Sequence, residues 1–316
     1  MHKNQFFESD SEVFDYKENK LLFTTDTFSN EDLFRDNNPY QLGRNLAVAT
    51  LSDILASGGA PLFYGHSMVV SKQWQLPFII EFSRGIADVI KLVDATFLGG
   101  DFGQSEKWQY TGIAIGEVVK PLSRIGAKNG DSVYLTGKAG AGNLEAALTL
   151  YSDLPLLGNL LKNYTTKFYN RFEEAKTIRD YATSCIDTSD GVFNAISTIA
   201  SLNKCGYLLE KIPILPEATL ATKLLGKPTE LLVMGECGEY ELLFTIPIEK
   251  ESEFQYEIVR NGLEIHKIGR ISDETVKKIR FDKRELNLNH FEISARAFDT
   301  TKEYLAVLTE FVKNQR

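Results

Sequence analysis

The chain has 316 residues, of which 43% are hydrophobic and 25% are charged, and it carries a net charge of −8 with a pI of about 5.2. This composition is typical of a soluble globular enzyme built from one large domain or two moderate ones. The acidic balance argues against a protein that binds nucleic-acid backbones, which needs a basic face, but it permits a nucleotide ligand whose phosphates are neutralised by metal ions.

The first half of the chain predicts strands and helices in alternation. Residues 20–28 read as a strand with a polar end, and a helix with apolar residues at helical spacing follows and ends at Gly58 and Gly59. A second strand, a second helix and three further strands are expected at 61–70, 77–93, 95–100, 110–119 and 130–137. This alternation favours a mixed α/β fold.

The second half repeats the mixture. Helices are expected at 144–150, from just after Asp190 to 203, and at 300–312, with a strand at 240–247. The charged stretch 162–179 reads as a solvated helix. The Gly/Ala-rich segment TGKAGAGN suggests a boundary between two domains, residues 1–137 and 138–316, which we expect to pack firmly because no long linker is visible.

The cysteines and the lengths of the apolar segments indicate the cellular compartment of the protein. The three cysteines are widely spaced and form no C-x-x-C pair, so neither a zinc ribbon nor a disulfide framework is supported. The first ten residues lack the apolar core of a signal peptide, and no stretch approaches the roughly 20 apolar residues that span a bilayer. We therefore expect a cytoplasmic protein with neither membrane nor nucleic-acid partners.

Aspartates recur beside expected strand ends and helix starts, and one lies on a helix. The first group is Asp10, Asp26, Asp101, Asp187 and Asp190, and the aspartate on the helix is Asp53. Because the strands of a sheet end together, such side chains can converge on one cleft, and Mg²⁺ prefers carboxylate oxygens. The sequence therefore predicts a magnesium site.

Each of these aspartates also has a simpler interpretation. Asp26 and Asp101 could be turn residues, the latter because it follows Gly99 and Gly100 where an apolar, buried strand stops. Asp190 could be the N-cap of the following helix. Asp53 lies inside an apolar helix, where a charge is costly unless it is paired or bound.

Six segments, in order along the chain, resemble motifs of the thiamine-monophosphate kinases, in the superfamily that also holds aminoimidazole ribonucleotide synthetase. They are LLFTTDTF (21–28), LGRNLAVATLSDILASGGAPL (42–62), FLGGDF (97–102), SRIGAKNGDSVYLTG (123–137), CIDTSDGV (185–192) and GECGEYELLFTIP (235–247). The resemblance implies a two-domain PurM-like α/β fold. In such a fold the mixed N-terminal sheet pairs with that of a second copy in a barrel-like homodimer, and a C-terminal α/β domain follows.

The resemblance also implies an ATP- and Mg²⁺-dependent kinase that phosphorylates a phosphate monoester, with thiamine monophosphate as the first candidate. The metal ligands it implies are Asp10, Thr24, Thr25, Asp26, Asp53, Asp101, Asp187 and Asp190. The nucleotide contacts it implies are Gly100, Asp101, Arg124 and Ser189, with Asp101, Asp190 and Arg124 as the catalytic residues. No P-loop motif is present, so metal ions must neutralise much of the phosphate charge. Arg124 could otherwise form a surface salt bridge.

The departures from the family pattern fall at the acceptor end. Leu33 stands where the family has a substrate-contacting histidine, and Ser9 replaces an N-terminal aspartate. Either Glu236 or Glu239 could serve as the family's substrate glutamate, and Phe298 either stacks on the substrate or belongs to the core. Two alternatives therefore stay open: a non-catalytic nucleotide-binding protein, and an ATP-dependent synthetase that acts on another small molecule.

Overall fold

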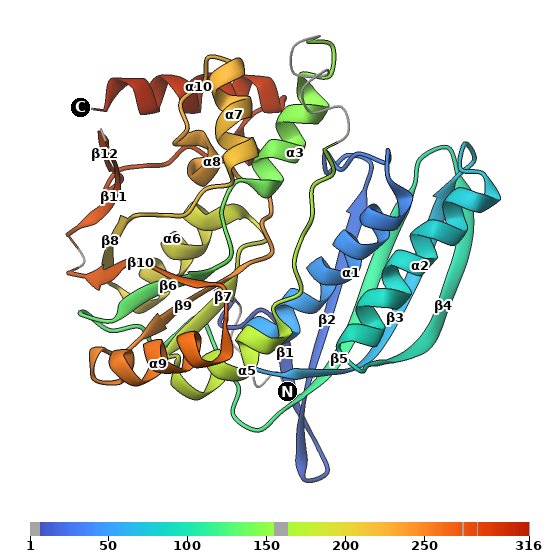
Figure 1. The fold of residues 1–316 in the computed structure, drawn as a ribbon, viewed down its shortest axis with the longest axis horizontal. Coiled ribbons are helices and arrows are strands. Elements are labelled where there is room, and N and C mark those ends of the chain that lie inside the picture. The colour runs from blue at the N-terminus through green and yellow to red at the C-terminus, as the bar shows by residue number, and fades with distance from the viewer. Residues whose placement is uncertain (1–6, 155–163, 274, 283, 316) are drawn as a thin grey trace.

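The computed structural model describes residues 7–154, 164–273, 275–282 and 284–315, and its two halves each contain a sheet (Figure 1). The N-terminal residues 1–6, on which part of the signal-peptide argument rests, and residues 162–163 of the charged stretch lie outside the described residues. Among the described residues, no helix combines the length and the apolar character needed to cross a membrane.

Within the described residues, the N-terminal half forms a five-stranded mixed sheet with the strand order β1-β2-β5-β3-β4. Its strands are β1 (Glu12–Tyr16), β2 (Asn19–Ser29), β3 (Ala60–Ser71), β4 (Thr96–Ser105) and β5 (Gln109–Val118). Helices α1 (Pro39–Ala56) and α2 (Leu76–Leu92) lie side by side against one face of this sheet (Figure 1). The other face bears exposed aromatic side chains, among them Phe23 and Phe63.

Helix α1 packs unusually close to the sheet, and this position sets up the site. Asn38 caps its N-terminus by accepting a hydrogen bond from the backbone N–H of Gln41. On β5, a Cβ atom at Gly112 would lie 2.0 Å from the Oγ1 atom of Thr50 on α1, so only glycine fits there. The close approach brings the last turns of α1 near β2.

Strand β4 differs from the sequence expectation. The strand was expected to be buried and to stop at Gly100, but it continues to Ser105 and is largely exposed. Gly100 pairs with His66 of β3, and a Cβ atom at Gly100 would lie 2.2 Å from the His66 carbonyl oxygen. Because glycine avoids this clash, pairing continues through Asp101, and because β4 is an edge strand with one uncovered face, its side chains stay exposed.

The C-terminal half forms a seven-stranded mixed sheet within the described residues, with the strand order β12-β11-β8-β10-β6-β9-β7. Its strands are β6 (Ser132–Thr136), β7 (Ser184–Asp187), β8 (Gly206–Glu210), β9 (Leu242–Ile246), β10 (Ile265–Ser272), β11 (Lys277–Phe281) and β12 (Arg284–Asn287). Its helices are α3 (Ala141–Leu150), α5 (Phe172–Tyr181), α6 (Gly191–Asn203), α7 (Pro216–Leu224), α8 (Leu231–Met234), α9 (Glu251–Asn261) and α10 (Thr301–Asn314). The mixed α/β class expected from the sequence is confirmed.

Strand β6 belongs to the second sheet, so the two sheets divide the chain between Val118 and Ser132. The domain boundary expected at 137/138 stays a prediction. In the charged stretch, helix α5 begins only at Phe172, and one of its faces is buried. The stretch is not fully solvated, because Arg171, just before the helix, is buried and its guanidinium pairs with Glu241 at 2.6 Å.

Candidate active site

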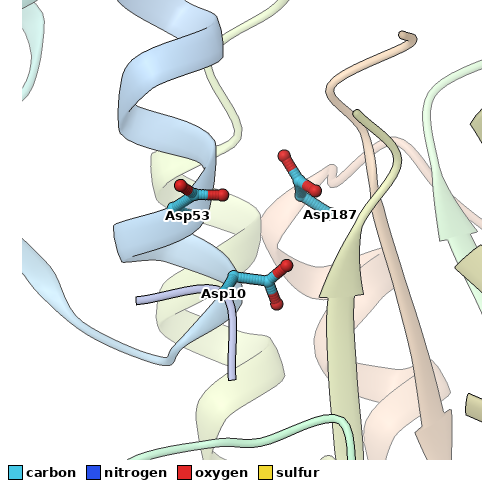
Figure 2. A group of neighbouring side chains, drawn as sticks. All are labelled: Asp10, Asp53 and Asp187. Carbon is cyan, nitrogen blue, oxygen red and sulfur yellow. The ribbon is translucent and has the colours of Figure 1, made fainter. Parts of the chain in front are cut away.

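Three carboxylates from distant parts of the chain meet where α1 contacts β7 (Figure 2). Asp10 precedes β1, Asp53 lies on α1 and Asp187 ends β7, and one oxygen from each lies within 4.8 Å of the others. Figure 2 shows the three side chains directed toward one another. The two halves of the molecule therefore build this group, called the carboxylate cluster below, together.

Hydroxyl groups orient the cluster. The Oγ1 atom of Thr24 donates to Asp53 at 2.5 Å, and the Oγ atoms of Ser52 and Ser189 donate to Asp187 at 2.6 and 2.8 Å. Thr24 comes from β2, and Ser52 precedes Asp53 on α1. Each carboxylate is thus held by a neighbouring polar side chain while keeping oxygen lone pairs free for another ligand.

Arg124 contributes positive charge beside the cluster. Its Nη2 atom donates to the Oδ1 atom of Asp10 at 2.7 Å, and the side chains of Arg124 and Asp10 are 17% and 1% exposed. The backbone N–H of Arg124 also donates to the carbonyl oxygen of Glu8 at 2.8 Å. Arg124 therefore fixes the segment that carries Asp10, and its ion pair is partly buried rather than on the open surface.

The cluster concentrates negative charge in a buried place. Burial, followed by the like charge of Asp187, raises the pKa of Asp10 to about 7 against the opposing effect of Arg124. Burial and the charges of Asp187 and Asp10 raise the pKa of Asp26 to about 7 as well. The pKa values of Asp53 and Asp187 are also raised, chiefly by burial. Such repulsion is relieved when a cation binds.

The residues present fit a hard divalent cation. Asp10, Asp53 and Asp187 offer oxygen ligands alone, with the Thr24 hydroxyl beside them, and four neighbouring carboxylates, including that of Asp26, face the single charge of Arg124. Mg²⁺ prefers this donor set, and the excess negative charge matches a divalent ion.

A cavity of about 610 Å³ lies next to the cluster, between the two halves. Asp26, Ser189 and Asp190 line it, so the cluster opens toward this space through them. Asp190 occupies the N-cap position of α6, as the simpler interpretation expected, but its side chain makes no cap hydrogen bond. Its carboxylate is exposed at the cavity wall.

Of the four residues that the sequence suggested as substrate contacts, two line the cavity and two do not. Leu33 and Glu236 line the cavity, and Glu236 accepts a hydrogen bond from the backbone N–H of Ala295 at 3.0 Å. Glu239 is 2% exposed and accepts from the backbone N–H groups at the start of α3, at distances of 2.7 to 3.2 Å. Phe298 packs against Tyr304, with ring centroids 5.9 Å apart, and is not among the described residues that line the cavity. The geometry thus favours Glu236 over Glu239 as the glutamate at the cavity.

The side chain of Thr25 does not share a face with the cluster. Successive residues of a strand point to opposite faces, so Thr25, which is exposed, points away from α1, whereas Thr24 and Asp26 point toward it.

Gly100 and Asp101 are also separated from the cluster within one chain. Asp26 pairs with Gly112, Gly112 with His66 and His66 with Gly100, so Gly100 lies three strands from Asp26. At about 4.8 Å per strand this is roughly 14 Å.

The sequence did not predict that Ser52 contacts the carboxylate cluster. Its hydroxyl binds Asp187, which lies 135 residues further along the chain. The only signal was its position directly before Asp53, and a serine inside a helix more often binds its own backbone, as Ser52 also does through the Ala49 carbonyl oxygen.

Comparison with known proteins gives consistent results. Residues 8–118 match the family described as AIR synthase related protein, N-terminal domain. The chain is 28% identical over 276 residues to the thiamine-monophosphate kinase of Aquifex aeolicus, covering 84% of this chain and 85% of that protein. It is 32% identical over 243 residues to the thiamine-monophosphate kinase of Leptospira interrogans, covering 72% and 75% of the two chains. The solved structure of AaThiL complexed with AMPPCP and TMP superposes with a TM-score of 0.72 at 24% identity, covering 88% of each chain, which establishes a shared fold.

Proposed function

The chain belongs to the thiamine-monophosphate kinase family, and on that basis we propose that it transfers the γ-phosphoryl group of ATP to thiamine monophosphate. In this reaction a phosphate oxygen of the acceptor forms a bond to the γ-phosphorus atom of ATP. The bond between that phosphorus and the bridging oxygen breaks, and ADP and thiamine diphosphate are released. The chemistry needs alignment and charge stabilisation more than covalent help from the protein.

One observation carries this proposal: the buried carboxylate cluster borders a cavity large enough for a small organic molecule. Asp26 joins the two, because its carboxylate interacts with Asp10 and Asp187 and also lines the cavity. A triphosphate at the cluster would therefore direct its terminal group toward an acceptor in the cavity.

The charged groups of the site have separate roles in the proposed reaction. Asp10, Asp53 and Asp187, with Asp26 beside them, would hold Mg²⁺. Bound Mg²⁺ supplies neutralisation of phosphate charge and orientation of the phosphates. Arg124 holds Asp10 in place, and Ser189 and Asp190 line the cavity next to the cluster.

The cavity lining suits a cationic acceptor with apolar rings. Among the described lining residues the carboxylates outnumber the cations Lys227 and Arg296, and aromatic and aliphatic side chains supply most of the remaining surface. The carboxylates are those of Asp26, Glu31, Asp32, Glu145, Asp190 and Glu236. Thiamine monophosphate combines a positively charged thiazolium ring with an aminopyrimidine ring, so charge and apolar contact are both matched.

The proposal includes a homodimer, which the exposed aromatic residues of the N-terminal sheet support. The uncovered face of the N-terminal sheet exposes Phe23 and Phe63 by 38% and 37%, and the edge strand β4 exposes Phe97 and Phe102 by 48% and 59%. Exposed aromatic side chains on this face and on this edge mark an interaction surface, and a second copy bound there is consistent with the family expectation. In such a dimer Gly100, Asp101 and Thr25, which one chain alone keeps away from its own cluster, would lie at the interface and could serve the second copy.

The test is a phosphoryl-transfer assay with the purified chain, ATP, Mg²⁺ and thiamine monophosphate, with products separated by chromatography. We expect ADP and thiamine diphosphate in equal amounts, and no product when the metal is chelated. Tight ATP binding with no Mg²⁺-dependent transfer to this acceptor would overturn the proposal and favour a non-catalytic nucleotide-binding protein. Release of free phosphate with an acyl substrate would favour a synthetase.

A further inference from the structure

The segment between β2 and α1, residues 30–38, forms one wall of the cavity, and we call it the acceptor loop. Glu31, Asp32, Leu33 and Phe34 line the cavity from this side, and α3 contributes residues 142–147 next to it. The position of this wall relative to the carboxylate cluster decides where an acceptor can sit.

The acceptor loop adopts a backbone conformation that needs outside support. Leu33 has a φ angle of +60°, in the left-handed region that side chains other than glycine rarely occupy. Its carbonyl oxygen accepts a hydrogen bond from the Oγ1 atom of Thr149 on α3 at 2.9 Å. The loop is therefore tied to α3 at the residue that faces the cavity.

A second and stronger tie lies two residues further on. The guanidinium of Arg35 binds both carboxylate oxygens of Glu145, with Nε to Oε1 and Nη2 to Oε2 distances of 2.8 Å, and the Arg35 backbone N–H donates to Oε1 at 2.9 Å. The two side chains are 17% and 8% exposed. Such a two-pronged, partly buried pair fixes geometry as well as distance.

Glu145 is itself held in place. The hydroxyl of Thr166 donates to its Oε2 atom at 2.6 Å, and Arg35 also donates to the carbonyl oxygen of Tyr164 at 3.1 Å. Phe34 packs its ring edge-on against Phe168, with centroids 6.0 Å apart. The acceptor loop, α3 and the segment around residues 164–168 thus form one locked unit.

We propose that the Arg35–Glu145 ion pair presets the acceptor loop, so that Leu33 and Phe34 form a fixed wall of the acceptor subsite. Arg35 is not among the described residues that line the cavity, so it is a positioning residue that acts through the loop. This inference rests on the proposed function, because it assigns the cavity to the phosphate acceptor. It predicts that breaking the pair weakens acceptor use while leaving the nucleotide end intact.

The experiment compares Arg35→Leu, Arg35→Lys and Glu145→Gln with the full-length wild-type chain. Arg260→Leu is the matched control, because it removes an exposed arginine of an ion pair with Glu257 on α9. Each protein is assayed for its KM and kcat with thiamine monophosphate and for its KM with ATP. Hydrogen exchange of the amides of residues 30–38 is measured without any substrate.

For Arg35→Leu we expect the KM for thiamine monophosphate to rise roughly ten- to a hundredfold, because a small displacement of a binding wall is costly. The KM for ATP should stay unchanged, and the acceptor-loop amides should exchange faster. Arg35→Lys should recover only part of the effect, since lysine cannot make the two-pronged contact. If Arg35→Leu does not fold, Arg35→Lys gives the same comparison, because Arg35 is not among the described residues that line the cavity, whereas Glu145 is.

An unchanged acceptor KM, or equal losses for acceptor and ATP, would overturn the inference. Failure of the proposed function is a separate result, because it shows in the wild-type chain as the absence of transfer to thiamine monophosphate. In that case the substrate-free exchange of the acceptor-loop amides still decides whether the ion pair presets the loop, and unchanged exchange in Arg35→Leu overturns it.

Discussion

The carboxylate cluster and the acceptor cavity lie side by side but are built differently. The cluster consists of short side chains on regular elements, such as Asp53 on α1 and Asp187 at the end of β7, so each charge is fixed by the backbone that carries it. The acceptor cavity is walled in part by a loop whose shape depends on contacts such as Arg35 with Glu145. We therefore expect the cluster to tolerate little change, and we expect the loop to set the shape of the cavity.

Asp187→Asn tests the carboxylate-cluster side of this comparison and is expected to have the largest effect, a loss of turnover. Removing a carboxylate from the cluster should lower Mg²⁺-dependent turnover about a thousandfold, because metal-based charge stabilisation contributes several kcal/mol. Steady-state kinetics at saturating acceptor would measure it. The control is Glu106→Gln, since Glu106 is exposed and pairs with Lys72. Near wild-type turnover in Asp187→Asn would contradict a metal role for the cluster.

The second effect concerns stability and pH. The folded pKa values of Asp10 and Asp26 are raised to about 7 from the ordinary 3.8, so their stabilising contribution is present at low pH and is lost as the pH rises through about 7. Without metal, the chain should therefore be less stable at pH 8 than at pH 6, by about 1–3 kcal/mol. Mg²⁺ should stabilise it more at pH 8.

Thermal unfolding with and without a chelator would measure this pH dependence. Asp53→Asn serves as the test variant, because its amide can still accept the hydrogen bond from Thr24 while removing one of the crowded charges. We expect a higher metal-free Tm at pH 8 in this variant and a smaller gain from Mg²⁺. A metal-free stability that does not fall between pH 6 and pH 8 would count against mutual repulsion in the cluster.

A smaller effect is expected at the acceptor end from Glu236→Ala. The loss of a carboxylate on the cavity wall should raise the KM for thiamine monophosphate about tenfold, the size of a charge-assisted contact, and leave the KM for ATP unchanged. The buried Glu239 gives a contrast: Glu239→Gln should mainly lower the Tm, because its carboxylate holds the start of α3. The reverse pattern for the two variants would show that the assignment of Glu236 to the acceptor is wrong.

The smallest effect is expected from Leu33→His. A histidine on the cavity wall adds a polar contact, and we expect a change of roughly three- to tenfold in kcat/KM for thiamine monophosphate, upward if this compound is the native acceptor. Competition assays against other phosphate monoesters would measure it. A fall in kcat/KM would indicate that the apolar wall is matched to a different acceptor.

Several details of the fold were beyond prediction because they depend on neighbours that are distant in sequence. The strand at residues 95–100 was expected to be buried because it is apolar, but β4 is an edge strand with one uncovered face. The charged stretch before residue 179 was expected to be solvated, yet Arg171 and Glu174 are buried, because Arg171 pairs with both Glu174 and Glu241. Neither partner choice is visible in local periodicity.

The sequence alone determined the chemical character of the site, because the charge and the oxygen atoms of a carboxylate belong to the residue type. Asp10, Asp26, Asp53 and Asp187 were all anticipated as site residues, and they come together in the structure, although Asp26 lies inside β2 rather than at a strand end. Tertiary structure alone decided which residues share that place. The alternation of β2 turns Thr25 away, two intervening strands, β5 and β3, separate Asp101 from Asp26, and the start of α3 engages Glu239. The physical reason is that side-chain direction and strand order arise from packing between segments that are distant in sequence, such as those of Arg35 and Glu145, which lie 110 residues apart.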